Sequence, residues 1–215
     1  MDISVIVTSY NYDKYIERCL RSLMNQSIKR FNYEIIVVDD ASTDHTIEIL
    51  KNYKDEIRLF SNEKNMGLPF SANMGIKMSR GQYVVRVDAD DFVHGDFLYM
   101  LYCTIDIERE FRSVSCDYYV TDRFGEKIQR LSQKTNPIAC GIMYHKDALF
   151  DIGLYNEEML IREDEDLMNR YLKKYKLLYL PIALYRYRNH ENSLTKDKKK
   201  MDYYAQKLQK KSYEQ

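Results

Sequence analysis

The 215-residue sequence lacks several features that would assign it to a class at once. Its 33 Lys and Arg are balanced by 33 Asp and Glu, so no net charge attracts nucleic acid. Its four cysteines form no CxxC pair and no metal-type spacing with the four histidines, which predicts reduced, mostly buried thiols. No apolar run approaches the ~20 residues of a membrane-spanning helix, and the N-terminus has a strand pattern rather than that of a signal peptide. We therefore expect a cytoplasmic protein without a nucleic-acid partner.

Glycine is scarce where nucleotide-binding loops need it. The turn expected at residues 8–11 reads Thr-Ser-Tyr-Asn and has none of the glycines that let a backbone approach a pyrophosphate. A phosphate loop of the GxxxxGK[ST] type is also absent. If the chain binds a nucleotide, a metal ion must therefore neutralise the phosphates.

The pattern that is present predicts an α/β domain. Apolar residues make up 45% of the chain, enough for a core. The first half alternates between strands and helices, and the strands are expected at 3–8, 33–38, 57–60 and 83–87. We expect Asp13 to cap the first helix, and a third helix to end near Met78. This alternation predicts a mostly parallel central sheet flanked by helices.

The second half is less regular. A helix is expected over 94–111, with Ile107 in its apolar set, followed by a hairpin over 115–128. A short strand (140–144), a short helix (146–152) and a helix opening at 162 follow. Two strands, 177–180 and 183–188, are expected around Pro181. No repeat or linker divides the chain.

Acidic residues follow the second and fourth predicted strands. Asp39 and Asp40 end one, and Asp88, Asp90 and Asp91 end the other. In open α/β folds, ligands bind at the carboxyl edge of the sheet. Carboxylates this close repel one another unless a cation lies among them, and their oxygens suit Mg²⁺ or Mn²⁺. An isolated Asp-rich turn is more often simply solvated.

Taken together, the motifs resemble those of the family 2 glycosyltransferases, which have the GT-A fold. The resemblance spans about residues 3–195 in the family's order, and it rests on six segments: Ser4 to Asn11, Val37 to Asp44, Asn65-x-Gly67 with Ala72-Asn73-x-Gly75, Gly81-x-Tyr83 to Asp91, Glu163-Asp164-x-Asp166-Leu167, and Tyr187-Arg188-x-His190-x-x-Ser193. It implies one catalytic domain over 1–195, with a nucleotide-binding half (1–91) and an acceptor-side half (92–195). A basic tail follows at 196–215.

The resemblance implies roles for matching residues on the donor side. Thr8 and Tyr10 would line the nucleoside pocket, and Asp40 would hydrogen-bond the base edge while Asp39 braces its loop. Asp88 would lie near the ribose of the donor, a nucleoside-diphosphate sugar such as a UDP-sugar.

The remaining roles concern the metal and the transfer. Asp90 would ligate the divalent cation, Mn²⁺ or Mg²⁺, on the donor diphosphate. His190 would reach the same metal or diphosphate, with Arg188 nearby. Asp164 would be the general base for an acceptor hydroxyl, although an acidic first turn also suits the helix dipole alone.

The implied activity is inverting, metal-dependent transfer of a sugar to a glycan or lipid-linked acceptor, in bacterial-type surface glycan or glycoconjugate synthesis. Many relatives have Arg where this chain has Ala72, which puts one donor contact in doubt. The short stretch after the His190 motif predicts a single-sugar transferase rather than a processive synthase. A sugar nucleotidyltransferase and a non-catalytic sugar-nucleotide-binding protein stay open as alternatives.

The tail from Thr195 carries seven Lys against Asp197, Asp202 and Glu214. A solvated helix or frayed end explains such a composition. The functional alternative is peripheral contact with an anionic membrane that presents a lipid-linked acceptor.

Overall fold

Four parallel strands form the first half of the sheet. They are β1 (Ile3–Ser9), β2 (Tyr33–Asp39), β3 (Arg58–Ser61) and β4 (Tyr83–Asp88). The computed structural model describes residues 1–27, 32–191 and 198–213. The strand order is β3-β2-β1-β4, with β1 in the middle and all of its residues buried. The expected parallel strands are confirmed, and β3 begins one residue later than predicted.

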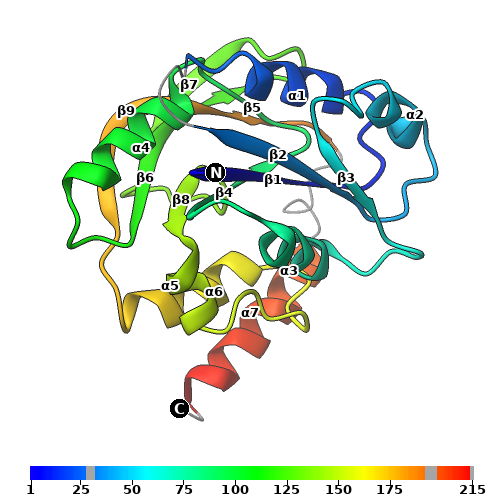
Figure 1. The fold of residues 1–215 in the computed structure, drawn as a ribbon. Helices are drawn as coiled ribbons and strands as arrows, with labels where there is room; N and C mark the ends of the chain where they lie inside the picture. The colour runs from blue at the N-terminus through cyan, green and yellow to red at the C-terminus, as the bar shows by residue number, and fades with distance from the viewer. Residues whose placement is uncertain (28–31, 192–197, 214–215) are drawn as a thin grey trace.

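The second half extends the same sheet with mixed pairing. Its strands are β5 (Phe92–Val93), β6 (Ser113–Thr121), β7 (Lys127–Leu131), β8 (Ile142–His145) and β9 (Leu178–Arg188). The order continues from β4 as β8-β6-β9-β5, and β7 pairs with β6. The predicted hairpin is the antiparallel β6–β7 pair. Figure 1 shows the whole sheet curled between the helices.

Helices cover both faces of the sheet. They are α1 (Ile16–Met24), α2 (Thr46–Lys51), α3 (Leu68–Met78), α4 (Phe97–Ile107), α5 (Lys146–Asp151), α6 (Glu163–Leu172) and α7 (Lys198–Tyr213). In Figure 1, α1 and α2 lie above the sheet, and α3, α5 and α6 lie below it. The apolar core is accordingly in two parts, one with α1 and α4 and one with α3, α5 and α6.

Gly75 explains how closely α3 lies on the sheet. A Cβ atom at this position would come 2.5 Å from Cγ2 of Ile6 on β1. Any larger residue would therefore force the Ile6 side chain, the helix or the strand to shift. Gly67, which precedes α3, has a φ of 91°, a conformation that glycine adopts readily. Both glycines belong to the motifs around α3.

Three local expectations are wrong. Asp13 does not cap α1: the helix begins at Ile16 and has no side-chain cap, and the Asp13 amide instead donates to Asp44 Oδ2 at 3.1 Å. Ile107 is not part of the apolar face of α4, because it ends the helix and is 76% exposed. The two strands expected around Pro181 form one strand, β9, whose register shifts against β6 at this point.

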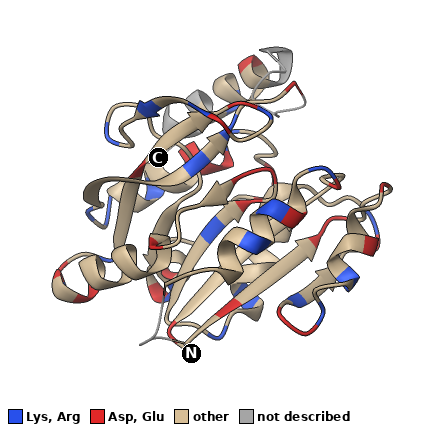
Figure 2. Ribbon diagram, turned by 90° about the horizontal axis from the view of Figure 1, so that it is seen from above, with Lys and Arg blue, Asp and Glu red and all other residues tan. Residues whose placement is uncertain are grey.

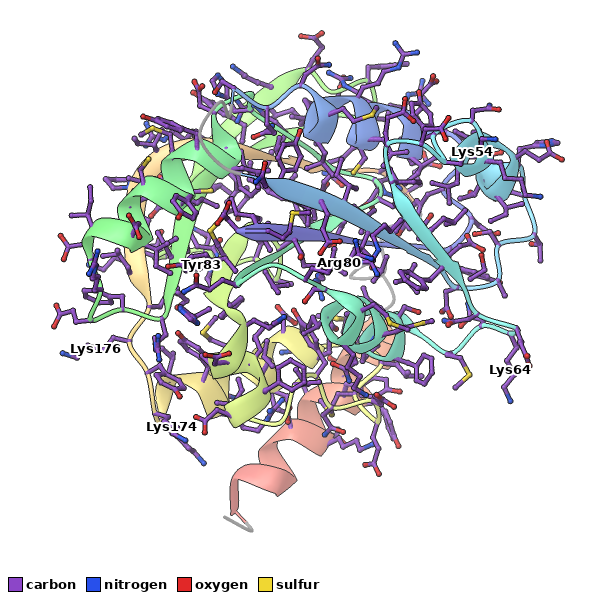
Figure 3. All side chains as sticks on the ribbon, in the orientation of Figure 1. Lys54, Lys64, Arg80, Tyr83, Lys174 and Lys176 are labelled. Carbon is purple, nitrogen blue, oxygen red and sulfur yellow. The ribbon has the colours of Figure 1, made fainter. Side chains whose placement is uncertain are left out.

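Charged residues of both signs are spread over the helices and loops, as the balanced composition requires (Figure 2). Side chains such as Lys54, Lys64 and Lys174 extend outward at the periphery (Figure 3). Among the described residues, no helix has both the length and the apolar character needed to cross a membrane. The division into halves at residue 91 stays a prediction, although β8 joins the two parts in one sheet.

Candidate active site

The turns after β1 and β2 are tied together at the carboxyl edge of the parallel strands. Thr8 is paired with Asp88 of β4 by the register of the sheet. Tyr10 follows β1 and is 42% exposed. Asn11 has a left-handed φ of 60°, and its side-chain carbonyl accepts the Thr43 amide hydrogen at 2.8 Å. The two residues expected at the nucleoside, Thr8 and Tyr10, therefore lie at one strand end.

Asp40 is a buried bracing residue in this structure. Its Oδ1 accepts hydrogen bonds from the Met66 amide (2.8 Å) and the Asn62 side chain (2.6 Å), and its Oδ2 accepts the Gly67 amide hydrogen (2.8 Å). The carboxylate thus fixes the turn before α3. Asp39 accepts two hydrogen bonds from the turn that follows it, which is the bracing expected of it. The base-edge contact of Asp40 stays a prediction.

Asp91 is the most enclosed carboxylate after β4, with 1% of its surface exposed. It accepts hydrogen bonds from the Tyr185 hydroxyl at 2.7 Å and the Arg188 amide at 2.7 Å, and Cys140 Sγ lies 3.7 Å from it. Burial and the two neighbouring Asp carboxylates raise the pKa of Asp91 well above its usual range. Asp91 therefore anchors β4 to β9 from inside.

Asp88 lies between the core and the open edge. Its Oδ1 is 3.1 Å from Arg86 Nε, and its side chain is 24% exposed. Burial raises the pKa of Asp88, and the carboxylates of Asp90 and Asp164 act in the same direction, while Arg86 opposes them. Because Arg86 contacts Asp88 and also Glu163 at the start of α6, Asp164, the next residue, lies on an element that is tied to this end of the site.

Asp90 and His190 form a pair across 100 residues of sequence. His190 Nε2 lies 2.7 Å from Asp90 Oδ2, and both side chains are largely buried. The rings of Tyr15 and Tyr12 pack against His190, with centroids 4.9 and 6.4 Å away. Burial and the three Asp carboxylates raise the pKa of Tyr12 well above its usual range. The protein thus places an imidazole against Asp90, the second of the three Asp residues at the end of β4.

Arg188 holds the loop after β4 in place. Its amide donates to Asp91, its Nε donates to the Asp90 carbonyl at 2.6 Å, and its Nη1 donates to the Arg123 carbonyl in the β6–β7 turn at 2.6 Å. Burial lowers the pKa of this guanidinium. Within the described residues, Nη2 of Arg188 is buried without a hydrogen-bond partner. The other two nitrogens of this guanidinium, Nε and Nη1, both donate hydrogen bonds to backbone carbonyls.

The start of α6 supplies Asp164. Arg162, directly before the helix, has a left-handed φ of 63°, and no side chain caps the helix. Glu163 is buried and bonded to Arg86, and Asp166 is buried and paired with Arg170. Asp164 lies between them, half-buried, and has no hydrogen bond among the described residues. Its carboxylate is therefore available to a ligand.

Two groups of side chains could hold a cation. Asp88, Asp91 and Cys140 place one ligand atom each within 4.8 Å of one another. However, burial raises the pKa of Cys140 well above its usual range, and a protonated thiol is a poor ligand for a hard cation. The carboxylate of Asp90 and the imidazole of His190 are the donor types that Mn²⁺ accepts, so they fit the predicted metal site.

An open depression of about 780 Å³ lies beside the Asp90–His190 pair. The α1 side contributes Lys14 and Tyr15 to its lining, and the β6–β7 turn contributes Arg123 and Phe124. Arg188 and Arg18 both donate hydrogen bonds to carbonyls of this turn. The wall of the depression is therefore fixed to the loop after β4.

The structure brings most predicted residues to one place. Thr8, Asp88, Asp90, Arg188 and His190 gather where β1, β4 and β9 end, and Arg86 links Asp88 to Glu163, the residue before Asp164 on α6. Sequence reasoning assigned no role to Arg86, to Tyr185 or to Cys140. Arg86 carried a usable signal, since a charged residue inside an apolar strand requires a buried partner. Ser193 lies outside the described residues.

A sheet of this type with acidic residues at the carboxyl ends of its strands is typical of GT-A glycosyltransferases, and the comparison with family models gives the same class. The model of glycosyl transferase family 2 matches residues 4–194. The chain therefore belongs to glycosyl transferase family 2.

Similar proteins carry related names. Over 90% of this chain, the sequence is 30% identical to glycosyltransferase GlyA of Streptococcus pneumoniae. Over 46% of this chain, it is 39% identical to the poly(ribitol-phosphate) β-N-acetylglucosaminyltransferase TarS of Staphylococcus aureus. It spans 31% of GlyA and 18% of TarS.

Solved structures show the same fold. The structure of TarS residues 1–349 with UDP-GlcNAc superposes with a TM-score of 0.78 at 26% identity, over 92% of this chain and 61% of that one. The mannosyltransferase PcManGT of Pyrobaculum calidifontis, solved with GDP-Man and Mn²⁺, also gives 0.78, at 18% identity, over 99% of this chain and 64% of that one. The GT-A fold expected from the sequence is confirmed.

Proposed function

We propose that residues 1–195 form the catalytic domain of an inverting, metal-dependent glycosyltransferase. The donor is a nucleoside-diphosphate sugar, a UDP-sugar by likeness to the TarS complex. The acceptor is a hydroxyl of a surface glycan or glycoconjugate, a class that includes the poly(ribitol-phosphate) in the name of TarS. The observation that supports this most is the Asp90–His190 pair, which places an imidazole against a carboxylate at the end of β4.

The donor-side residues suit a diphosphate. Asp90 and His190 would hold the divalent cation. When bound, such a cation supplies positive charge to a leaving diphosphate. The buried Nη2 of Arg188 adds a donor that has no partner among the described residues, and Lys14 and Arg123 line the depression beside it. Thr8, Tyr10 and Asp40 would shape the nucleoside pocket, and Asp88 would face the ribose.

The transfer requires one displacement at the anomeric carbon of the donor sugar. The acceptor oxygen forms a bond to C1 as the bond from C1 to the diphosphate oxygen breaks, and the hydroxyl proton moves to Asp164. The half-buried Asp164 has no hydrogen bond among the described residues, so it can accept this proton. Attack opposite the leaving group inverts the configuration, and the domain contributes by aligning the two substrates.

A nucleotide-sugar panel tests this proposal. The purified protein is incubated with UDP-, GDP- and dTDP-sugars, Mn²⁺ and candidate polyol-phosphate or glycan acceptors, and released nucleoside diphosphate is measured. We expect diphosphate release that depends on one donor and rises with acceptor. Pyrophosphate release from a nucleoside triphosphate and a sugar phosphate would instead identify a nucleotidyltransferase, and donor binding without any turnover would identify a non-catalytic binder.

Metal dependence is tested at Asp90. Asp90→Asn keeps the size of the side chain and removes its charge, so both donor affinity and turnover should fall. Chelator should abolish activity in the wild-type protein, and Mn²⁺ or Mg²⁺ should restore it. Full activity in chelator contradicts the metal-dependent mechanism.

A further inference from the structure

Arg86 is a charged residue inside a buried strand. Its neighbours on β4, Val85 and Val87, are fully buried, and Arg86 itself is 6% exposed. Side chains alternate along a strand, so Arg86 lies on the opposite face from these two valines, the face covered by α3 and α5. A guanidinium in such a place is costly unless it is paired.

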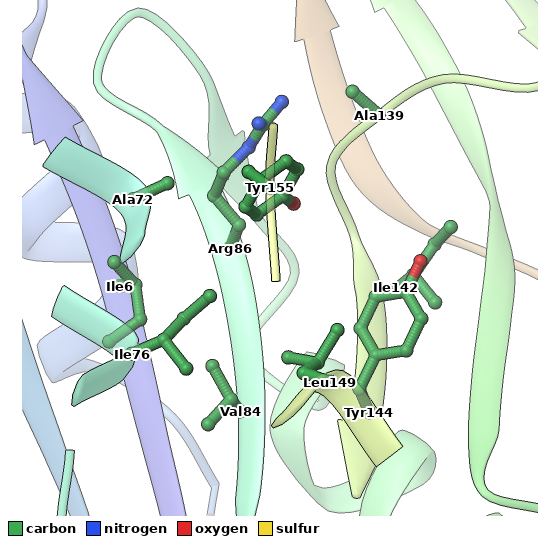
Figure 4. Close-up of a pocket in the computed structure, with 10 residues that line it drawn as sticks. All are labelled: Ile6, Ala72, Ile76, Val84, Arg86, Ala139, Ile142, Tyr144, Leu149 and Tyr155. Atoms are coloured by element: carbon green, nitrogen blue, oxygen red, sulfur yellow. The ribbon is translucent and has the colours of Figure 1, made fainter. Parts of the chain in front are cut away.

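Two carboxylates pair with it, that of Asp88 on the same strand and that of Glu163, 77 residues further along the chain. Arg86 Nη1 donates to Glu163 Oε1 at 3.0 Å, and Arg86 Nε lies 3.1 Å from Asp88 Oδ1. Its Cζ lies 5.4 Å from the centre of the Tyr155 ring. Figure 4 shows Arg86 next to Tyr155, at the edge of an apolar cavity of about 10 Å³ that α3 and α5 help to line. One side chain thus joins the end of β4 to the first residue of α6.

The charges around Arg86 agree with this geometry. Burial opposes the charge of Arg86, but Asp88, Tyr155 and Glu163 hold its pKa well above the usual range. Burial raises the pKa of Glu163 to about 7, the Asp164 carboxylate adds to this, and Arg86 acts against both. A single cation therefore moderates the repulsion between the carboxylates that face each other across the site.

The first turn of α6 is tied to the sheet through Glu163, whereas Asp166 ties it to Arg170 and the loop after α5. No side chain caps the helix, and Arg162 before it has a left-handed backbone. Asp164 follows Glu163 directly, so the position of one sets the position of the other. Among the described residues, the buried ion pair that connects this turn to the sheet is the one between Arg86 and Glu163.

We propose that Arg86 is a positioning residue for sugar transfer, which holds Glu163 and thereby sets Asp164 against the donor side of the site. The inference rests on the proposed function. Lysine cannot replace arginine here, because an ammonium group lacks the planar fork that reaches two carboxylates at once. The role concerns alignment, so its loss should reduce transfer to the acceptor more than binding of the donor.

A double-mutant cycle tests the proposal with Arg86→Lys, Glu163→Gln and the double variant. We measure kcat and KM for transfer, donor hydrolysis without acceptor, and nucleoside-diphosphate affinity by calorimetry. A misplaced catalytic group costs up to ~10²-fold, so we expect each single variant to lose ~10- to 10²-fold in transfer kcat. Donor affinity should change less than ~3-fold, and the double variant should be no slower than the slower single variant, because both break the same contact.

Glu34→Gln is the matched control. Glu34 is also a buried carboxylate, with Arg58 Nη1 2.6 Å from its Oε2, but it lies at the start of β2, at the far end of the sheet. The Glu34→Gln variant should be less stable than the wild-type protein, and its kcat for transfer should be unchanged. If Arg86→Lys does not fold, Glu163→Gln compared with this control decides the question.

The outcomes separate the two proposals. A wild-type protein that transfers sugar, together with single variants that transfer equally well, overturns this inference alone. Additive losses in the double variant, or equal losses in transfer and hydrolysis, also overturn it. A wild-type protein that turns over no donor overturns the proposed function, and this inference with it.

Discussion

Asp164 and Asp166 lie two residues apart on α6 in different surroundings. Asp166 Oδ2 accepts hydrogen bonds from Arg170 at 2.9 and 2.7 Å, and Arg170 also donates to the carbonyls of Ile152 and Leu154. Asp166 therefore braces the loop after α5. Asp164 makes no such contact among the described residues, so its carboxylate is available to a ligand.

This contrast predicts unequal effects of the same change. Asp164→Asn keeps the size of the side chain but cannot take up a proton, and loss of a general base typically costs ~10²–10⁴-fold in rate. Asp166→Asn should be milder in rate and should lower the melting temperature instead. Diphosphate release measures the rate, and calorimetry should show intact donor binding in Asp164→Asn. Near-normal turnover in that variant would move the search for the base to Glu163 or Asp166.

The buried carboxyl of Glu163 predicts a pH dependence of stability. Its pKa is raised to about 7 in the folded protein, above its usual 4.5. A group with a raised pKa favours the folded state below its usual pKa and loses this contribution as pH rises through the folded value. Between about pH 5 and 8, the wild-type protein should thus lose stability relative to Glu163→Gln.

The change with pH in the difference in unfolding free energy between the wild-type protein and Glu163→Gln has an upper limit. One proton corresponds to at most about 1.4 kcal/mol per pH unit. Urea unfolding of both proteins at each pH measures the difference, and ionisable groups elsewhere largely cancel in the comparison. Parallel stability curves for the two proteins would contradict the prediction.

The contact between α3 and β1 gives a prediction about an element. In Gly75→Ala, the new methyl group would overlap Ile6, and overpacking of a core costs about 1–3 kcal/mol. The gain in helix propensity, about 1 kcal/mol, offsets part of this. We expect a net fall in the free energy of unfolding, measured by urea denaturation. Gly95→Ala is the control, because its nearest neighbour, the Asn25 carbonyl, would lie 3.5 Å from the new atom.

Elements with a long, regular pattern could be predicted from the sequence. The runs that became β1, β2 and β4 are apolar and β-branched, and α3 begins with proline near its start, as expected. The two-residue strand β5 is too short to leave a pattern. The start of α1 was misplaced because backbone contacts to Tyr12 fix it, not the side chain of Asp13.

Some features of the candidate site could also be predicted from the sequence, and others could not. The family resemblance implied that Asp90, His190 and Asp164 share one site, and the structure brings Asp90 and His190 into contact. The contacts of Arg86 could not be foreseen, since Glu163 lies 77 residues further along the chain and nothing local indicates the pair. For the same reason, the sequence did not show that Arg188 is committed to the carbonyls of Asp90 and Arg123.

At the scale of the whole molecule, α7 packs near the start of α6. Lys207 donates a hydrogen bond to the Glu158 carbonyl at 2.9 Å, and Arg162 Nε donates to the Met201 carbonyl at 3.3 Å. The helix thus contacts the segment that leads into the site. We propose that the lysines of the tail also contact an anionic membrane, where each contributes about 1 kcal/mol.

Sedimentation with vesicles tests the membrane contact. The full chain should sediment with phosphatidylglycerol vesicles at low salt more than a variant that lacks residues 196–215. Both should stay in solution with phosphatidylcholine vesicles, and salt should remove the difference. Equal sedimentation of the two proteins with the anionic vesicles would contradict the membrane contact.

The uneven pairing of β9 with β6 makes chain length matter near the site. Between the pairs Cys116↔Leu180 and Tyr118↔Tyr185, β6 advances by two residues while β9 advances by five, a surplus of three around Pro181. Because side chains alternate, an odd surplus exchanges the faces of every later residue of β9. Deleting one residue there would turn Arg188 to the other side of the sheet, whereas many replacements would not. Natural relatives should therefore vary in composition at this bulge while keeping its residue count.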